Sequence, residues 1–317
     1  MAIADFKDKQ NIRGIFYCQY KSTGVTKAGK DYFNLNLTDK TGSISAKVWD
    51  VTSPGIREFD VKDFVEATGS VQIFNGGLQL VISNISVAEP GTYDPHDFMP
   101  TSKRDIEEMY TQLLAVTDKV TNPYLRKLID MYFREDTAFI AKFKEHSAAK
   151  AMHHGFVGGL LEHTLGVVSN CDWIADRYPW LDKSLLLTAA LFHDIGKIYE
   201  LSPFPDNDYT KAGDLLGHIV IGYNMINTSI GKIQGFPNDL KLELEHCIIA
   251  HHGKEEFGSP KKPGIAEALA LTFADDLDAK MEMCIEGLDS MNEEDEKARP
   301  KGLDAAIRRT GEWDVNN

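Results

Sequence analysis

Apolar and polar residues alternate through most of the first 90 residues of the chain. The run DYFNLNLTD places Phe33, Leu35 and Leu37 on one face, and SISAKVWD alternates in the same way. A period of two is typical of strands that bury one face against a core. The turn sequence DKTG joins these two runs, and an Asn-Gly-Gly sequence at 75–77 separates two further apolar runs. The pattern therefore predicts short antiparallel strands joined by tight turns.

Five such runs fit within about eighty residues. That number and spacing favour a small closed β-barrel of the OB type over residues 1–90, with a fragment of a β-sandwich as the alternative. The stretch EPGTYDPHDFMPTS follows, with three prolines and no periodicity. We therefore place a linker at residues 91–104.

From residue 105 to residue 290 the apolar residues recur three and four positions apart, as in Leu160, Leu161, Leu165 and Val168. This period predicts a second, all-α domain, so the chain is multidomain. The expected helices span 105–117, 122–133, 137–149, 159–177, 183–192, 213–230, 239–251 and 264–284. Residues 291–317 are charged and lack an apolar stripe, so we expect a loosely attached extension.

The charge is distributed unevenly between these two parts. The chain carries a net charge of −14, which argues against a surface covered by basic patches. Residues 12–88, however, contain eight Lys and Arg against seven Asp and Glu, a balance of +1. A polyanion would meet less repulsion at the barrel than elsewhere.

One face of the barrel carries side chains suited to nucleic acid. Tyr32, Lys47 and Trp49 lie opposite the apolar face of their strands. Such side chains can stack on bases and contact backbone phosphates, which predicts single-strand binding. The alternative for Trp49 is that it seals one end of the barrel.

The chain shows no sign of export or membrane insertion. The N-terminal MAIADFKDKQ has no apolar core of a signal peptide, and no run approaches eighteen apolar residues. The cysteines form no CxxC pair, so we expect reduced thiols rather than a disulfide framework. They are Cys18, Cys171, Cys247 and Cys284. These features predict a cytoplasmic protein with no membrane partner.

Histidines and aspartates recur in order through the helical region. The segments are EHT at 162–164, HDIGK at 193–197, GHI at 217–219, AHHG at 250–253 and ADDLDA at 274–279. Imidazole and carboxylate groups are ligands for divalent transition metals, and helical bundles build such sites from several helices. A single histidine in a helix is usually structural, so His96, His146 and His246 receive no role. The ordered set, expected within helices, predicts a metal site in the bundle core.

This pattern resembles the HD superfamily of metal-dependent phosphohydrolases. The resemblance implies a first metal ion with four ligands, which are His163, His193, Asp194 and Asp275. It implies a second ion bound by Asp194, His218 and His251, with His252 as a close competitor of His251. Asp278 is then expected to be a structural residue at a helix end. Gly159 stands where a three-metal branch of the family has glutamate, which argues against a third ion.

The barrel together with HHGFVGGLLEHT and LFHDIGK resembles the YhaM-type 3′→5′ exoribonucleases, over roughly residues 10–290. The resemblance implies stepwise release of nucleoside 5′-monophosphates from the 3′ end of single-stranded RNA. Whether single-stranded DNA is also a substrate stays open. It also implies two divalent ions. Mn²⁺ is the expected metal, and Co²⁺, Fe²⁺, Ni²⁺ or Zn²⁺ are the alternatives. Assembly into a homo-oligomer stays open.

Three residues receive catalytic roles. Asp194 would serve both ions, since two cations can neutralise a phosphodiester and lower the pKa of a water. Lys197 would stabilise charge on the phosphoryl group, with a salt bridge at the helix end as its alternative. His154, like its neighbour His153, would contact a substrate phosphate or cap the following helix.

Two other functions compete with this interpretation. One is hydrolysis of small nucleotides such as cyclic dinucleotides, dNTPs or alarmones. The barrel favours a strand as substrate, and no GYP follows AHHG, which counts against the cyclic-di-GMP branch. The other is a non-catalytic RNA-binding protein, which the complete set of metal ligands opposes.

Overall fold

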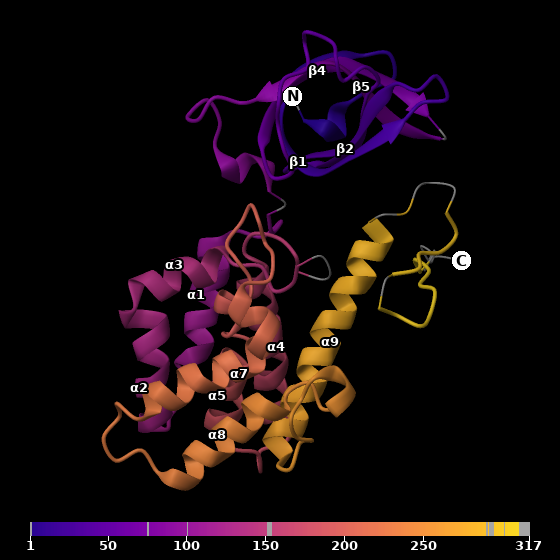
Figure 1. Ribbon diagram of the computed structural model, residues 1–317. Coiled ribbons are helices and arrows are strands. Elements are labelled where there is room, and N and C mark those ends of the chain that lie inside the picture. The colour runs from indigo at the N-terminus through magenta and orange to yellow at the C-terminus, as the bar shows by residue number, and fades with distance from the viewer. Residues whose placement is uncertain are drawn as a thin grey trace, which may run out of the picture. The chain divides into compact units, whose positions relative to one another are not determined.

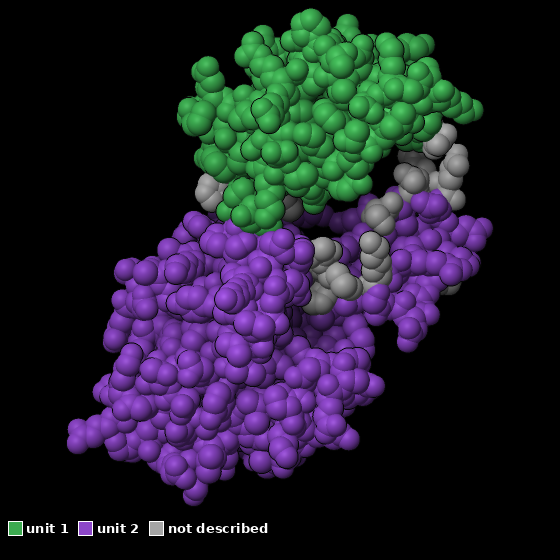
Figure 2. Space-filling model, in the orientation of Figure 1, with its two compact units in different colours: residues 1–101, 204–206 green, residues 102–203, 207–317 purple. Residues whose placement is uncertain are grey.

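The structure is a computed structural model that describes residues 2–74, 76–99, 101–150, 154–289, 291, 295–300 and 302–310. The chain forms two compact units. One comprises residues 1–101 with 204–206, and the other comprises residues 102–203 with 207–317 (Figure 2).

The first unit is a closed barrel of five strands, and this confirms the predicted barrel over the sandwich fragment. The strands are β1 (Asn11–Val25), β2 (Asp31–Asp39), β3 (Gly42–Val48), β4 (Phe64–Phe74) and β5 (Gly77–Val87). They follow one another around the barrel in the order β1-β2-β3-β5-β4 (Figure 1). All neighbours are antiparallel except β3 and β5. Asn75 of the predicted turn lies outside the described residues.

The alternation of the sequence explains how the barrel fills its interior. Leu35 and Leu37 of β2 face Ala46 and Ile44 of β3 across the ladder, and all four side chains are buried. The short 3₁₀ helix η1 (Ile3–Asp5) begins where the Ile3 amide donates to the Asp39 carboxylate over 2.7 Å. The polar faces of the same strands are left outside, where they are available to a ligand.

The second unit is all-α, also as predicted. Its helices are α1 (Ile106–Thr117), α2 (Pro123–Asp130), α3 (Thr137–Glu145), α4 (Gly159–Arg177), α5 (Lys183–Phe192), α6 (Lys197–Glu200), α7 (Lys211–Ile230), α8 (Asn238–Ala250) and α9 (Ala266–Asp289). Short helical segments complete the list of elements: η2 (Pro95–Phe98) in the first unit, and η3 (Met131–Glu135, a π-turn) and η4 (Glu255–Phe257) in the second. Asp or Asn side chains accept from backbone amides at the starts of α1, α2, α3 and α5, which fixes where those helices begin.

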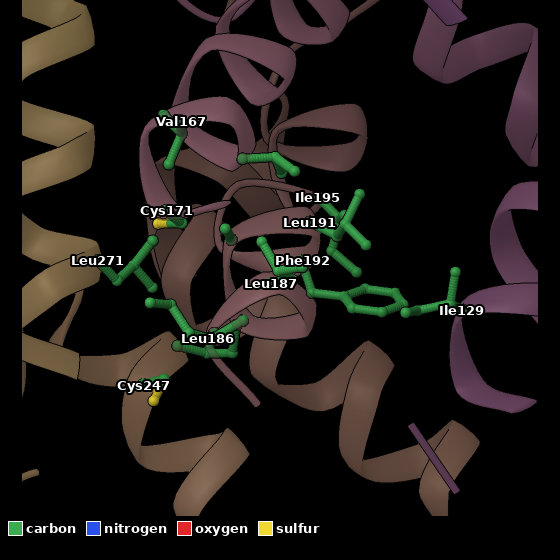
Figure 3. Packing of buried hydrophobic residues seen from close by; sticks show 14 of the residues in the cluster. Ile129, Val167, Cys171, Leu186, Leu187, Leu191, Phe192, Ile195, Cys247 and Leu271 are labelled. Atoms are coloured by element: carbon green, nitrogen blue, oxygen red, sulfur yellow. The ribbon is translucent and has the colours of Figure 1, made fainter. Parts of the chain in front are cut away.

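Helix α5 lies at the centre of the helical core. Residues 184–192 are all buried, as expected for a helix that is apolar on every side. Figure 3 shows its Leu186 and Phe192 between Ile129 of α2 and Leu271 of α9. The rigid core helix ends immediately before the HD pair, so it fixes the position of that pair.

Two further observations concern membrane insertion and the C-terminal stretch. None of the helices in the described ranges combines the length and apolar character that crossing a bilayer would require. In the charged C-terminal stretch, Arg309 donates to the Leu288 carbonyl at the end of α9 over 2.8 Å, and Ala298 pairs with Ile307.

Candidate metal centre

The six side chains predicted to bind metal converge within the helical unit. They come from α4 (His163), the turn after α5 (His193 and Asp194), α7 (His218), the end of α8 (His251) and α9 (Asp275). The HD pair lies in a turn between α5 and α6, which corrects the expectation that the whole set would lie within helices.

Asp194 lies between two groups of imidazoles. Its Oδ2 atom is 3.4 Å from Nε2 of both His163 and His193. Its Oδ1 atom is 3.4 Å from His218 Nε2 and 3.7 Å from His251 Nε2. Two ligand atoms that each lie about 2.1 Å from one ion are roughly 3 to 3.5 Å apart. One oxygen of the carboxylate therefore faces the first group of imidazoles, and the other oxygen faces the second group.

The first group contains two imidazoles and a second carboxylate. His163 Nε2 lies 3.2 Å from His193 Nε2 and 3.2 Å from Asp275 Oδ1, and His193 Nε2 lies 3.8 Å from the same oxygen. Nitrogen and oxygen donors from α4, from the turn after α5 and from α9 thus surround one point.

The second group contains both histidines of the AHHG segment. Asp194, His218, His251 and His252 each offer one ligand atom, and these four atoms lie within 4.8 Å of one another. His251 is fully buried, whereas His252 is partly exposed and directs Nδ1 to the Phe257 carbonyl over 2.7 Å. The structure thus brings both candidate residues to the second group.

Three buried atoms of this second group support a cation as their partner. Asp194 Oδ1, His218 Nε2 and His251 Nε2 have no hydrogen-bond partner among the described residues. A buried polar atom without a partner is costly, and native proteins satisfy nearly all of them. A divalent ion would satisfy all three atoms at once, so the donor set fits a metal.

Two of the histidines are oriented by the same kind of hydrogen bond to the backbone. His193 and His251 each follow the last residue of a helix, and their Nδ1 atoms point to the carbonyl three residues earlier. The distances are 2.8 Å to the Ala190 oxygen and 2.7 Å to the Ile248 oxygen. With Nδ1–H donating to the backbone, Nε2 keeps its lone pair and faces the centre.

The other two histidines are oriented by carboxylates. His163 Nδ1 lies 2.8 Å from Asp278 Oδ2, and His218 Nδ1 lies 3.0 Å from Glu200 Oε1. Asp278 lies in the middle of α9, so the expectation of a helix-end residue was wrong. Its position three residues after Asp275, on the same helix face, could have indicated a role beside the metal. Glu200 was missed altogether, because it precedes the α6–α7 loop and nothing local pairs it with His218.

Close backbone packing holds the two halves of the centre together. A Cβ atom at Gly196 of the HDIGK turn would lie 2.0 Å from the His218 carbonyl oxygen. Only glycine therefore allows the turn that carries Asp194 to approach α7 so closely. This contact brings His218 to the second oxygen of Asp194.

The two other residues assigned to catalysis have neighbours inside the protein. Lys197 Nζ lies 2.6 Å from Asp194 Oδ2, so the alternative salt bridge is present. His154 Nε2 lies 3.2 Å from Asp278 Oδ2, which places it behind His163. His153 and the side chain of His96 lie outside the described residues.

The protonation states of Asp194, Asp275 and His251 suit metal ligands. Burial opposes the charge of His163, but Asp194, Asp275 and Asp278 outweigh burial and raise its pKa well above the usual value. Burial opposes the ionised form of Asp194, but Lys197 and His193 outweigh burial and hold its pKa well below the usual range. Burial likewise opposes ionisation of Asp275, and His163 reverses this effect and lowers that pKa. Burial, followed by the nearby His252, lowers the pKa of His251 well below its usual value. Ionised carboxylates and a neutral imidazole are the forms that bind cations.

The predicted strand-binding residues also lie together. The rings of Tyr32 and Trp49 have centroids 5.3 Å apart with 37° between their planes. Lys47 Nζ lies 4.5 Å from the Tyr32 centroid and 5.3 Å from that of Trp49. Trp49, the residue after β3, is 47% exposed, so the three residues form an accessible aromatic and cationic patch at β2 and the end of β3.

Comparison with known proteins assigns a domain to each unit. Residues 160–280 match the HD domain family, and residues 19–88 match the OB-fold nucleic acid binding domain family. The chain thus combines an HD domain, which is a metal-dependent phosphohydrolase domain, with an OB-fold domain.

Some solved structures are similar to part of this chain. One is the second OB-fold domain of replication protein A from Methanococcus maripaludis, at 22% identity, covering 29% of this chain and 98% of that one, with a TM-score of 0.24. Another is a mitochondrial single-stranded DNA binding protein from S. cerevisiae, at 11% identity, covering 27% of this chain and 100% of that one, with a TM-score of 0.22.

Proposed function

We propose that this protein is a metal-dependent 3′→5′ exoribonuclease that degrades single-stranded RNA to nucleoside 5′-monophosphates. Two divalent ions would serve the reaction, and Mn²⁺ is the metal that we expect. The observation that carries the proposal is the position of Asp194, with one oxygen facing His163 and His193 and the other facing His218 and His251.

Two separate ligand sets would hold the ions on either side of Asp194. The first comprises His163, His193, Asp194 and Asp275, and the second comprises Asp194, His218 and His251. When bound, such ions neutralise the charge of a phosphodiester and make a water nucleophilic near neutral pH. The residues of the chain would hold such ions at fixed positions, because the helices that carry these residues form one packed core.

Lys197 adds a positive charge to this carboxylate-rich pocket. Burial opposes its charge, but Asp194 outweighs burial and raises the pKa of the ammonium group. In the proposed reaction this ammonium group turns toward the phosphoryl oxygens as charge develops there. Lys197 Nζ lies 2.6 Å from Asp194 Oδ2, so the ammonium group would lie close to a phosphate bound at the centre.

The barrel supports a nucleic-acid strand as the substrate. Tyr32 and Trp49 offer two neighbouring rings, and Lys47 offers a cation beside both, a combination that binds bases and backbone without reading sequence. The preference for RNA and the 3′→5′ direction rest on the likeness of HHGFVGGLLEHT and LFHDIGK to the exoribonuclease family.

A degradation assay tests the proposal. Single-stranded RNA labelled at its 5′ end is incubated with Mn²⁺ and the wild-type chain, the Asp194→Ala variant or the Asp276→Ala variant. Asp276 is the matched control, because it lies next to Asp275 but pairs on the surface with Lys280. We expect a ladder that shortens from the 3′ end, and 5′-mononucleotide products, with the wild type and the control only.

Two outcomes would contradict this function. Internal cuts, or products with 3′-phosphates, would show a different nuclease. Intact RNA together with hydrolysis of a dNTP, an alarmone or a cyclic dinucleotide would establish the small-nucleotide alternative. Parallel reactions on single-stranded DNA would show whether the sugar is discriminated.

A further inference from the structure

A buried carboxylate, Glu200, and a partly buried one, Asp278, lie behind histidines of the metal centre. Glu200 contacts His218 of the second group, and Asp278 contacts His163 of the first. Neither acid belongs to the predicted ligand sets. Each therefore acts on a different half of the centre.

Glu200 holds His218 by two hydrogen bonds to one oxygen. Its Oε1 atom accepts from the His218 backbone amide over 2.9 Å and from Nδ1–H over 3.0 Å. Burial opposes ionisation of Glu200, but these bonds outweigh it and lower the carboxyl pKa. The paired contacts fix both the backbone and the ring of His218, so the direction of Nε2 is determined.

A break in α7 makes this double contact possible. Gly217 has φ 70° and ψ 159°, which an L side chain rarely adopts, and it interrupts the helix one residue before His218. The break leaves the His218 amide free for a side chain, as at the start of a helix. A Cβ atom at Gly217 would lie 3.9 Å from Glu200 Oε1, so the carboxylate lies directly beside the break.

Asp278 performs the corresponding task for His163. Its Oδ2 atom accepts from His163 Nδ1 over 2.8 Å and lies 3.2 Å from His154 Nε2. Burial opposes ionisation, but the two histidines outweigh it and lower the Asp278 pKa to about 2. On α4, a Cβ atom at Gly166 would lie 1.9 Å from Asp278 Oδ1, so glycine provides the space for this carboxylate.

We infer that Glu200 and Asp278 are positioning residues that set the affinities of the two metal pockets separately. Glu200 governs the pocket of His218 and His251, and Asp278 governs the pocket of His163, His193 and Asp275. The inference rests on the two-ion site of the proposed function. Removing a carboxylate behind a metal-binding histidine typically weakens metal binding about 10- to 100-fold, and here each loss would affect one ion.

Calorimetric titration of the full chain with Mn²⁺ tests the inference. The near-isosteric variants Glu200→Gln and Asp278→Asn each serve as the control for the other. We expect each variant to keep one ion at wild-type affinity and to bind the other about 10- to 100-fold more weakly. Glu200→Ala should weaken Mn²⁺ binding in the pocket of His218 and His251 more than Glu200→Gln does, because the amide oxygen of glutamine can still accept from His218.

A His218→Ala background identifies the affected pocket. The His218→Ala substitution removes a ligand of the second pocket, so the ion that still binds occupies the first pocket. Asp278→Asn should weaken the binding of this ion, and Glu200→Gln should not. Equal weakening of both ions by either variant, or wild-type binding by both, would overturn the inference. So would a reversed pattern in the His218→Ala background.

The readout is metal binding, so the result does not depend on which substrate the enzyme cleaves. Two-ion binding by the wild type with no RNA degradation would contradict the exonuclease and leave the inference standing. Two-ion binding with normal RNA degradation, and no change in either variant, would contradict only the inference. Binding of a single ion by the wild type would contradict both.

Discussion

The metal centre and the strand-binding patch of the barrel differ in how firmly their side chains are held. His193, Asp194 and His251 are at most 2% exposed, and the Nδ1 atom of each of these imidazoles is bonded to the backbone. Tyr32 and Trp49, by contrast, are supported mainly by each other and by Lys47, and they remain accessible. Metal chemistry needs fixed donor atoms, whereas stacking tolerates small movements. Substitutions at the centre should therefore abolish nearly all hydrolysis, whereas substitutions at the patch should weaken RNA binding only partly.

The largest effect is expected at Asp194. Asp194→Asn keeps the shape but removes the charge shared by both groups, so hydrolysis of RNA and of a small chromogenic phosphodiester should both fall on the order of 10³-fold or more. Steady-state rates on the two substrates measure this. A variant that lost only RNA degradation would show that the centre acts in strand binding rather than chemistry.

Removing the aromatic patch should have an intermediate effect that depends on the substrate. Tyr32→Ala and Trp49→Ala should each weaken RNA binding by about 1 to 3 kcal/mol, or about 5- to 150-fold. Hydrolysis of the small phosphodiester should not change. Fluorescence anisotropy with labelled RNA measures the affinity, and Trp180→Ala is the control, since Trp180 is an exposed tryptophan of the helical unit. Unchanged RNA affinity in both patch variants would assign the barrel another role.

Lys47 should contribute less, and through charge. Lys47→Gln should weaken RNA binding a few-fold at low salt and reduce the slope of log affinity against log salt by about 0.7, as for one lost phosphate contact on a single strand. Lys30→Gln is a surface control on the same barrel, in the turn before β2. An unchanged slope would mean that Lys47 serves only to support the two rings.

The smallest effect is expected at an ion pair that serves stability alone. Asp172 lies within 2.5 Å of Lys119 and 2.7 Å of Lys183. Burial raises the Asp172 pKa, but the two lysines outweigh burial and lower it overall. The pair should therefore stabilise the fold above the unfolded pKa of about 3.9 and lose this contribution as pH falls through the folded value.

Chemical unfolding of Asp172→Asn measures this contribution. We expect a loss of about 1 kcal/mol at pH 7, a smaller loss near pH 3, and unchanged rates on both substrates. A large loss of activity would show that Asp172 acts on the metal centre and does not serve stability alone.

The regular elements and the inward-facing residues were predictable because their signals are local. Alternation at Phe33, Leu35 and Leu37 indicated a strand, and the spacing of apolar residues placed α4 and α5 at their observed bounds. The order of histidines and aspartates indicated the centre, because metal ligands are restricted to a few residue types.

What the sequence left hidden depends on contacts between distant segments. Glu200 acquires its role only when the break at Gly217 turns the His218 amide toward it. The space for Asp278 depends on a glycine of another helix. The predicted helix 122–133 ends at Asp130 and continues as the π-turn η3. None of these features has a pattern within a short window of sequence.

An anomalous diffraction experiment on crystals soaked in Mn²⁺ tests the central claim most directly. We expect one peak on each side of Asp194, the first among His163, His193 and Asp275 and the second among His218 and His251. Each peak should lie at a coordination distance of about 2.0 to 2.3 Å from those donor atoms. Absence of density at both positions, or a peak bound elsewhere, would contradict a hydrolase built on this centre.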